Sequence, residues 1–111
     1  MPTNIKTFRN ESDHSIIVFN SENIGNSFWI KAKHTENTKP GLWISWHKDL
    51  PLILCTIKGM CHIWDVDWKI HGQWEGNSNE IIFLDGSDKG VGGDIQVSVT
   101  KDGDIEMKKA G

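Results

Sequence analysis

Residues 94–109 read DIQVSVTKDGDIEMKK and indicate the fold class of the chain. Over residues 95–99, Ile and Val alternate with Gln and Ser, which is the pattern of a strand with one buried face. The tetrapeptide at 101–104 contains an Asp-Gly pair, a strong signal for a hairpin turn. A second strand is predicted at Ile105–Lys109. The end of the chain is therefore predicted to be an antiparallel hairpin.

Short runs of the same kind recur towards the N-terminus, with turn residues between them. The predicted strands are Ile5–Arg9, His14–Phe19, Ser27–Lys33, Leu42–His47, Leu52–Ile57, Met60–His71, Glu80–Leu84, Asp94–Thr100 and Ile105–Lys109. The intervening segments are predicted as turns or loops, among them Asn20–Asn26, His34–Pro40 and Gly72–Asn79. Apolar spacing typical of a capped helix is lacking. The sequence predicts an all-β, antiparallel two-sheet β-sandwich, forming a single domain over residues 1–111.

Strict alternation also predicts which side chains face the core. In the run 60–71, the predicted core face carries His62, Trp64, Val66, Trp68 and Ile70. The opposite, solvated face would carry Ile63, Asp65, Asp67, Lys69 and His71. In the run 42–47, Leu42, Ile44 and Trp46 are predicted to point inward.

Composition excludes several classes of protein. The 111 residues are 37% hydrophobic and 24% charged, which is typical of a folded domain. A net charge of −3 disfavours nucleic-acid binding, which normally requires a basic surface. Neither a signal-peptide pattern nor a membrane-spanning apolar run is present in the sequence, so we expect a cytoplasmic protein, either retained there or released by an unconventional route. In that compartment Cys55 and Cys61 are expected to be free thiols.

Motifs for catalysis, metals or cofactors are missing from the sequence. The five histidines lack metal-ligand spacing. The run 85–90 (DGSDKG) is similar to a calcium-binding loop, but Lys89 stands where that loop needs an oxygen ligand. A carboxylate pair suited to glycoside hydrolysis cannot be identified. We therefore expect a binding protein without a cofactor rather than an enzyme.

Tryptophan is the strongest functional signal. Six tryptophans lie between Trp29 and Trp74, and the chain has no tyrosine. Alternation assigns Trp29 and Trp43 to polar faces, whereas Trp74 falls in a predicted loop. An exposed indole is a large apolar surface that needs a cover. That cover could be a sugar ring, a packed sheet or partner subunit, or a lipid headgroup layer.

The residues around Trp74 favour a sugar. Asn side chains both donate and accept hydrogen bonds, and Glu accepts them, which suits adjacent hydroxyl groups. The predicted carbohydrate site has one wall formed by Trp74, Glu75, Asn77 and Asn79 and a second formed by Trp43 and His47. The expected partners are glycans or glycoproteins. Because a shallow site binds weakly, we also expect a homo-oligomer, for which Trp29 and Trp43 are alternative contact residues.

A resemblance supports binding functions of this type. Residues 8–18 (FRNESDHSIIV) resemble the first hairpin of aegerolysins, small acidic β-sandwich proteins that bind membrane lipids. They are also similar to the opening of small sandwich lectins. The acidic composition and abundant tryptophan resemble the cytoplasmic haemagglutinins of fungi and slime moulds. These resemblances imply a sugar-binding or lipid-binding β-sandwich, and they assign no individual residue.

Overall fold

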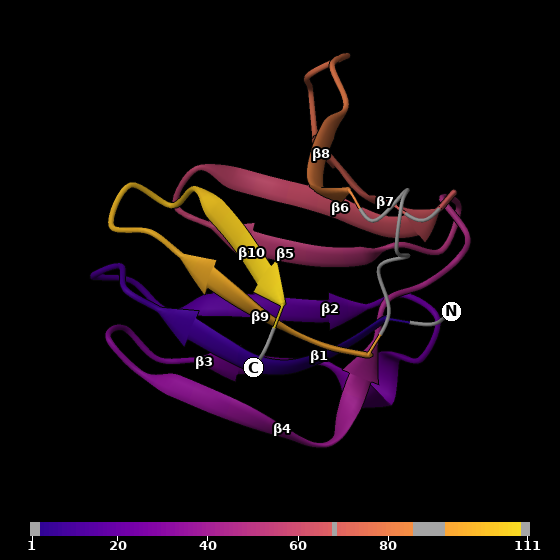
Figure 1. Cartoon of the computed structure of the whole chain (residues 1–111). Coiled ribbons are helices and arrows are strands. Elements are labelled where there is room, and N and C mark those ends of the chain that lie inside the picture. Colours follow the sequence, from indigo (N-terminus) through magenta and orange to yellow (C-terminus); the bar gives the residue numbers. More distant parts are fainter. Residues whose placement is uncertain (1–2, 68, 86–92, 110–111) are drawn as a thin grey trace.

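The computed structural model describes residues 3–67, 69–85 and 93–109, and these form ten strands and one short 3-10 turn (Figure 1). The strands are β1 (Thr3–Asn10), β2 (Ile16–Asn20), β3 (Phe28–Ile30), β4 (Thr35–Trp43), β5 (Leu52–Thr56), β6 (Gly59–Val66), β7 (Lys69–Trp74), β8 (Ile81–Asp85), β9 (Gly93–Val99) and β10 (Ile105–Lys109). The 3-10 turn, η1, spans Ile24–Asn26. The predicted all-β fold is confirmed.

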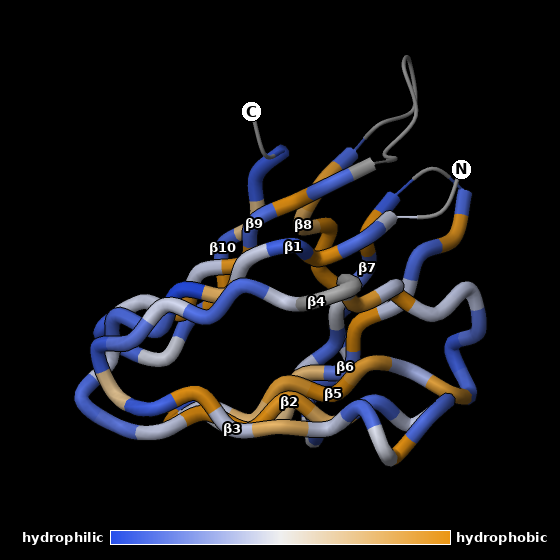
Figure 2. Tube along the Cα trace, turned by 90° about the horizontal axis from the view of Figure 1, so that it is seen from below, coloured by the Kyte–Doolittle hydropathy of each residue, from blue (hydrophilic) through white to orange (hydrophobic). Residues whose placement is uncertain are grey.

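The strands form two sheets of unequal width. One sheet has four strands in the order β10-β9-β1-β4, and the other has six in the order β3-β2-β5-β6-β7-β8. Figure 2 shows β4, β1, β9 and β10 as one layer and β3, β2, β5 and β6 as the facing layer. In Figure 1, β8 rises away from the rest of the six-stranded sheet. This two-layer arrangement is the predicted sandwich.

A hydrophobic core fills the space between the layers, as the alternation in most strands predicts. Its fully buried members include Ile5, Phe8, Val18, Leu54, Ile63 and Ile95. In the last hairpin, residues 95, 97 and 99 are buried and the turn lies at 101–104, as predicted. No helix within the described residues is long and apolar enough to cross a membrane.

Strand pairing departs from the prediction in one respect, because β1 and β9 run parallel. The other strand pairs of the described residues are antiparallel. The chain enters β9 after completing the six-stranded sheet, and it crosses back to lie beside β1 in the same direction. A parallel pair needs such a long crossover and cannot be recognised from a hairpin turn.

Three segment predictions are wrong. The predicted loop His34–Pro40 is mostly strand β4, which pairs with β1, and the predicted strand Leu42–His47 leaves the sheet after Trp43. The predicted long strand Met60–His71 is a hairpin, closed by the pair Val66–Lys69 with Asp67 at φ 57° in the turn. Asp tolerates this left-handed conformation better than most residues.

The turn at Asp67 also explains an inverted face assignment in β6. Cys61 and Ile63 are fully buried, and they lie opposite Leu54 and Leu52 of β5. His62, predicted to be in the core, lies on the other face and is half-buried. Trp64 is buried as predicted, although it does not belong to the core between the sheets. The prediction failed because it treated residues 60–71 as one continuous strand with a single inward face. The turn at Asp67 interrupts that strand, and the inward residues change from one side of the turn to the other.

The two cysteines are free, as predicted, and lie on opposite faces of the six-stranded sheet. The hairpin between β5 and β6 closes at Thr56–Gly59, so Leu54 lies opposite Cys61 and Met60 lies opposite Cys55. Burial raises the pKa of the Cys61 thiol to about 12. Burial, and then the charge of Glu75, raise the pKa of Cys55. Neither thiol is therefore activated.

One carboxylate is buried at the end of β6. Asp65 is 7% exposed, and its Oδ2 has no hydrogen-bond partner among the described residues. Its backbone N–H donates to the carbonyl of Ser45, which holds the segment after β4 against β6 (2.8 Å). Burial raises the pKa of Asp65 because the charged form loses hydration. Asp65 was predicted to be solvated, and the inverted face of β6 explains the difference.

Candidate functional site

The tryptophans fall into two groups according to burial. Trp29, Trp43 and Trp46 are exposed by 71%, 57% and 58% of their surface. Exposure was predicted for Trp29 and Trp43, whereas Trp46 was predicted to be in the core and is not. Trp64 is buried and Trp74 is half-buried. The core position predicted for Trp68 lies outside the described residues.

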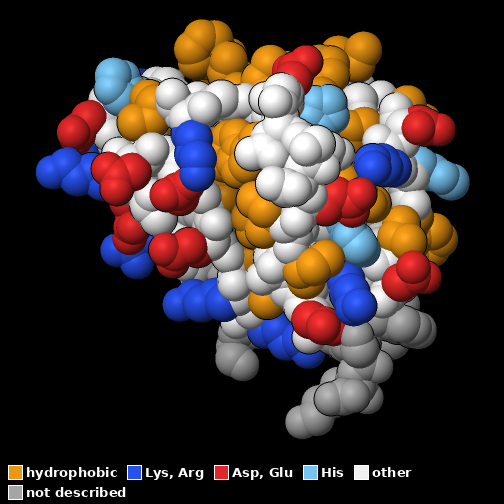
Figure 3. Space-filling model, turned by 90° about the horizontal axis from the view of Figure 1, so that it is seen from above, with side chains coloured by type: hydrophobic (Ala, Val, Ile, Leu, Met, Phe, Trp, Pro, Cys, Tyr) orange, Lys and Arg blue, Asp and Glu red, His pale blue; other side chains and the backbone are white. Residues whose placement is uncertain are grey.

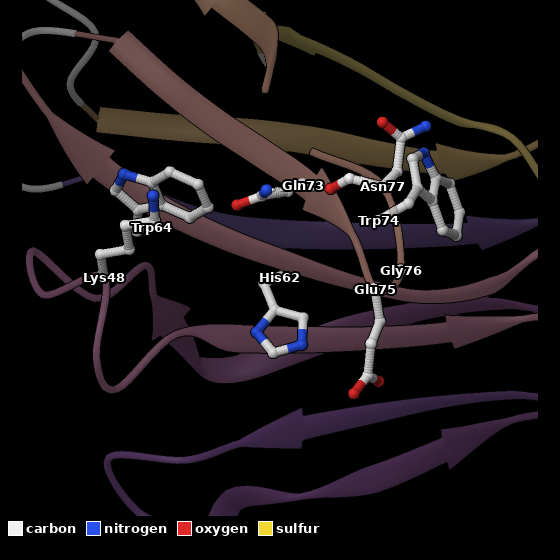
Figure 4. Close-up of a pocket in the computed structure, with 8 residues that line it drawn as sticks. All are labelled: Lys48, His62, Trp64, Gln73, Trp74, Glu75, Gly76 and Asn77. Carbon is white, nitrogen blue, oxygen red and sulfur yellow. Dashed lines mark hydrogen bonds between the residues drawn. The ribbon is translucent and has the colours of Figure 1, made fainter. Parts of the chain in front are cut away.

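A shallow depression lies between the indoles of Trp64 and Trp74, on the β6–β7 hairpin. Its cavity volume is about 210 Å³. The lining residues are Lys48, His62, Trp64, Gln73, Trp74, Glu75, Gly76 and Asn77. Figure 4 shows Trp64 and Trp74 at opposite ends, with His62 and Gln73 between them. Aromatic ends with polar groups between them are typical of sites that bind small polar ligands.

Strand pairing in the hairpin sets this arrangement. His62 lies directly opposite Gln73, and Trp64 lies opposite His71. Directly opposed residues share a face of the sheet, so these four side chains project on the side away from the core. The base of the depression is therefore the outer face of a rigid pair of strands.

The turn after β7 supplies the rest of the lining. The N–H of Asn77 donates to the carbonyl of Trp74 (3.0 Å), and Gly76 takes a φ of 84°, which favours glycine. Gln73 Nε2 donates to the carbonyl of Asn77 (2.9 Å). Asn77 Oδ1 accepts from the backbone N–H of Asn79 (2.9 Å). These bonds fix the loop even though its side chains are exposed.

Packing against charged and aromatic neighbours fixes the wall at Trp64. The rings of Trp64 and His71 are stacked, with centroids 5.5 Å apart and planes 8° from parallel. Lys48 Nζ lies 4.9 Å from the Trp64 ring centroid and also pairs with Glu80 (3.2 Å). The other Glu80 oxygen lies 3.4 Å from His71 Nδ1. Trp64 is therefore a structural wall, with its surface already covered.

The remaining polar groups are available to a ligand. The side chains of His62 and Glu75 make no hydrogen bond or ion pair to residues that the structure describes. Glu75 is exposed, and its backbone N–H donates to the carbonyl of Met60 (2.8 Å). The depression thus presents a carboxylate, an imidazole, two side-chain amides and the half-buried indole of Trp74.

The predicted site residues separate into two sets. Trp74, Glu75 and Asn77 line the depression together, as one predicted wall requires. Asn79 is exposed beside Asn77 but does not line the depression. Trp43 and His47 do not form the second wall, which consists of Lys48 and Trp64. Trp74 was predicted to lie in a loop, but it is the last residue of strand β7 and packs against the core.

Sequence reasoning missed Lys48, His62, Trp64 and Gln73 as lining residues. The last three depend on the cross-strand register of the β6–β7 hairpin. Apolar and polar residues alternate without a break from Trp64 to Ile70, so alternation carried no signal for that turn. Lys48 lies in an irregular segment, and its position depends on tertiary contacts with Trp64 and Glu80.

Metals and known relatives do not identify the site. Within the ranges 3–67, 69–85 and 93–109, no three His, Cys, Asp or Glu side chains are grouped as a metal site would require. The possible calcium loop at 85–93 lies largely outside the described residues. Comparison of the chain with family models, with curated proteins and with solved structures gives no match.

Proposed function

We propose that the protein is a carbohydrate-binding protein, a small lectin, which holds a sugar in the depression beside Trp74. One observation carries this proposal: the half-buried Trp74 at the end of β7 lines the same depression as Gln73, Glu75 and Asn77, which carry two amides and a carboxylate (Figure 4). An indole covers the C–H face of a sugar ring, while amides and a carboxylate pair with its hydroxyl groups. The proposed partners are glycans or glycoproteins.

The shallow site argues for weak binding to a single sugar, roughly in the millimolar to micromolar range. Hydroxyl groups exchange water for protein at a small net gain, and an open depression buries little surface. A homo-oligomer with several sites would raise the avidity. We therefore include oligomerisation in the proposal, and sedimentation equilibrium measures it directly.

A glycan array with the purified protein tests the proposed function. We expect binding to a limited set of glycans that free sugar competes away. The variant Glu75→Ala/Gln73→Ala should reduce the signal about tenfold or more, because both side chains are proposed to bind hydroxyl groups. Glu22→Ala, at an exposed position that does not line the depression, is the matched control. A silent array, or a double variant that binds like the parent, would show that the depression is not a sugar site.

Lipid binding is a second candidate function, and a different region favours it. The loops after β2 and before β5 leave the sheet at the same end, since Asn20 pairs with Leu52 and the N–H of Ser21 donates to the carbonyl of Pro51 (3.4 Å). These loops expose Ile24 and Leu50, and Trp46 lies in the second of them. Exposed indole and aliphatic groups at one end of a protein suit a membrane interface.

Vesicle sedimentation separates the two candidates. If lipid binding holds, phosphatidylcholine vesicles pellet the parent protein, and Trp46→Ser/Leu50→Ser stays in the supernatant. Glu75→Ala/Gln73→Ala should pellet normally, because the depression is not used. Pelleting of both variants alike would contradict a membrane contact at these loops.

A further inference from the structure

A second, larger hollow lies on the inner face of the six-stranded sheet, across the end of β7 from the depression on the outer face. It is a groove of about 460 Å³ between β8 and β10, the edge strands of the two sheets. The apolar side chains lining it are Trp74, Ile81, Ile82, Phe83, Ile105 and Met107. The charged residues that line the groove are Lys58, Asp104 and Glu106. Figure 3 shows, on the face seen from above, several exposed hydrophobic side chains interspersed with charged ones.

The groove exists because the sheets differ in width. The four-stranded sheet ends at β10, so among the described strands none faces the inner side of β8 and the end of β7. Trp74, Phe83 and Met107 are half-buried and pack against the core there. The groove is therefore an open flank of the hydrophobic core.

Two sets of contacts fix the position of the strands and turns around this groove. Phe83 lies so close to Gly72 that a Cβ on Gly72 would meet Phe83 Cε2 at 2.1 Å. The turns of the β5–β6 and β9–β10 hairpins are joined, since Thr56 Oγ1 donates to the carbonyl of Gly103 (2.7 Å) and Lys58 pairs with Asp104. Lys58 Nζ also lies 5.1 Å from the Trp74 ring centroid. Contacts from β5, β7 and β8 and from the two hairpin turns therefore fix the groove.

Trp74 lines both the groove and the polar depression. The depression alone, about 210 Å³, is smaller than most small-molecule sites, whereas the groove lies within their usual range of roughly 300–1,000 Å³. A ligand that used both would have a polar end among Gln73, Glu75 and Asn77 and an apolar end over Phe83.

We propose that the groove binds the apolar aglycone of a glycoside whose sugar lies in the depression, so that the ligand is an amphipathic glycoside. This inference rests on the proposed function and specifies its ligand class. An apolar chain is favoured over a protein partner because a stable protein interface needs roughly 800 Å² on each side, far more than this narrow groove provides.

The test compares methyl and n-octyl glycosides of glucose, galactose and mannose, below the critical micelle concentration, by titration calorimetry. For the sugar that binds, the octyl glycoside should bind about 10- to 100-fold more tightly, because several methylene groups leave water. In Ile81→Ser and Met107→Thr this gain should shrink, while methyl glycoside binding stays unchanged. Ile17→Ser, at an isoleucine about as exposed as Ile81 that does not line the groove, is the matched control. Circular dichroism checks that each variant folds.

The outcomes separate the inference from the proposed function. Equal affinity for methyl and octyl glycosides would overturn the aglycone site and leave sugar binding intact. If octyl glycosides bind no better than 1-octanol and methyl glycosides do not bind, the proposed function fails, and the inference fails with it. A gain that survives both groove variants would place the alkyl chain elsewhere and overturn the inference.

Discussion

The inner face of the six-stranded sheet has two regions that differ in burial. In β2, β5 and β6 it lies under the four-stranded sheet, and Val18, Leu54 and Ile63 are fully buried. In β8 and at the end of β7 none of the described strands covers it, and Phe83 and Trp74 are half-buried around an open groove. Side chains of the same type therefore serve as core in one region and as a surface for a ligand in the other. Sheet width, rather than residue type, makes the difference.

The largest expected difference between the two regions is the loss of stability when an isoleucine is truncated to alanine. Ile63→Ala should lower the free energy of unfolding by about 3 kcal/mol, because a fully buried side chain leaves a cavity. Ile81→Ala should cost less than about 1 kcal/mol, because Ile81 is 38% exposed. Urea denaturation measures both. Equal losses would mean that the groove is as well packed as the core.

The fit between Gly72 and Phe83 gives the next largest effect. Gly72→Ala should cost about 2 kcal/mol, because the new Cβ forces Phe83 out of its position. In a Phe83→Ala background the same change should cost less than about 0.5 kcal/mol. This double-mutant cycle, measured by urea denaturation, isolates the contact. Additive losses would show that strand propensity, and not the clash, explains the cost.

The pH dependence of stability tests whether Asp65 is buried in the covered region. Because burial raises its folded pKa above the unfolded value, its contribution is most favourable at pH below the unfolded pKa and is lost as pH rises through the folded pKa. The stability of Asp65→Asn relative to the parent should therefore increase from about pH 3 to pH 7. Thermal unfolding across this range measures it. Asp67→Asn, at an exposed position in the adjacent turn, is the matched control. A flat difference for Asp65→Asn would indicate a solvated carboxylate.

The smallest effect concerns thiol reactivity. Cys61 is fully buried on the covered face with a pKa raised to about 12, whereas Cys55 is half-buried on the outer face. Titration with a disulfide reagent should count one slowly reacting thiol in the native protein and two after denaturation. Cys55→Ser should abolish the native reaction. Two native thiols reacting at equal rates would show that the covered face opens readily.

Local patterns predicted the parts of this protein that depend on neighbouring residues. The β9–β10 hairpin was predicted because alternation and an Asp-Gly turn act within 16 residues. The grouping of Trp74, Glu75 and Asn77 was predictable for the same reason, since a single turn holds them. The β6–β7 hairpin was not recognised, and with it His62, Gln73 and the correct face of Asp65 were missed.

By itself, then, the sequence determined an all-β chain, the inward faces of most strands and a polar turn next to a tryptophan. Only the tertiary structure decided that β1 pairs in parallel with β9 and that Lys48 covers Trp64. It also decided that the four-stranded sheet stops at β10, which leaves Trp74 between a polar depression and an apolar groove. Alternation specifies which side chains of a strand lie on the same face. Whether another sheet lies over that face depends on contacts between residues far apart in the chain.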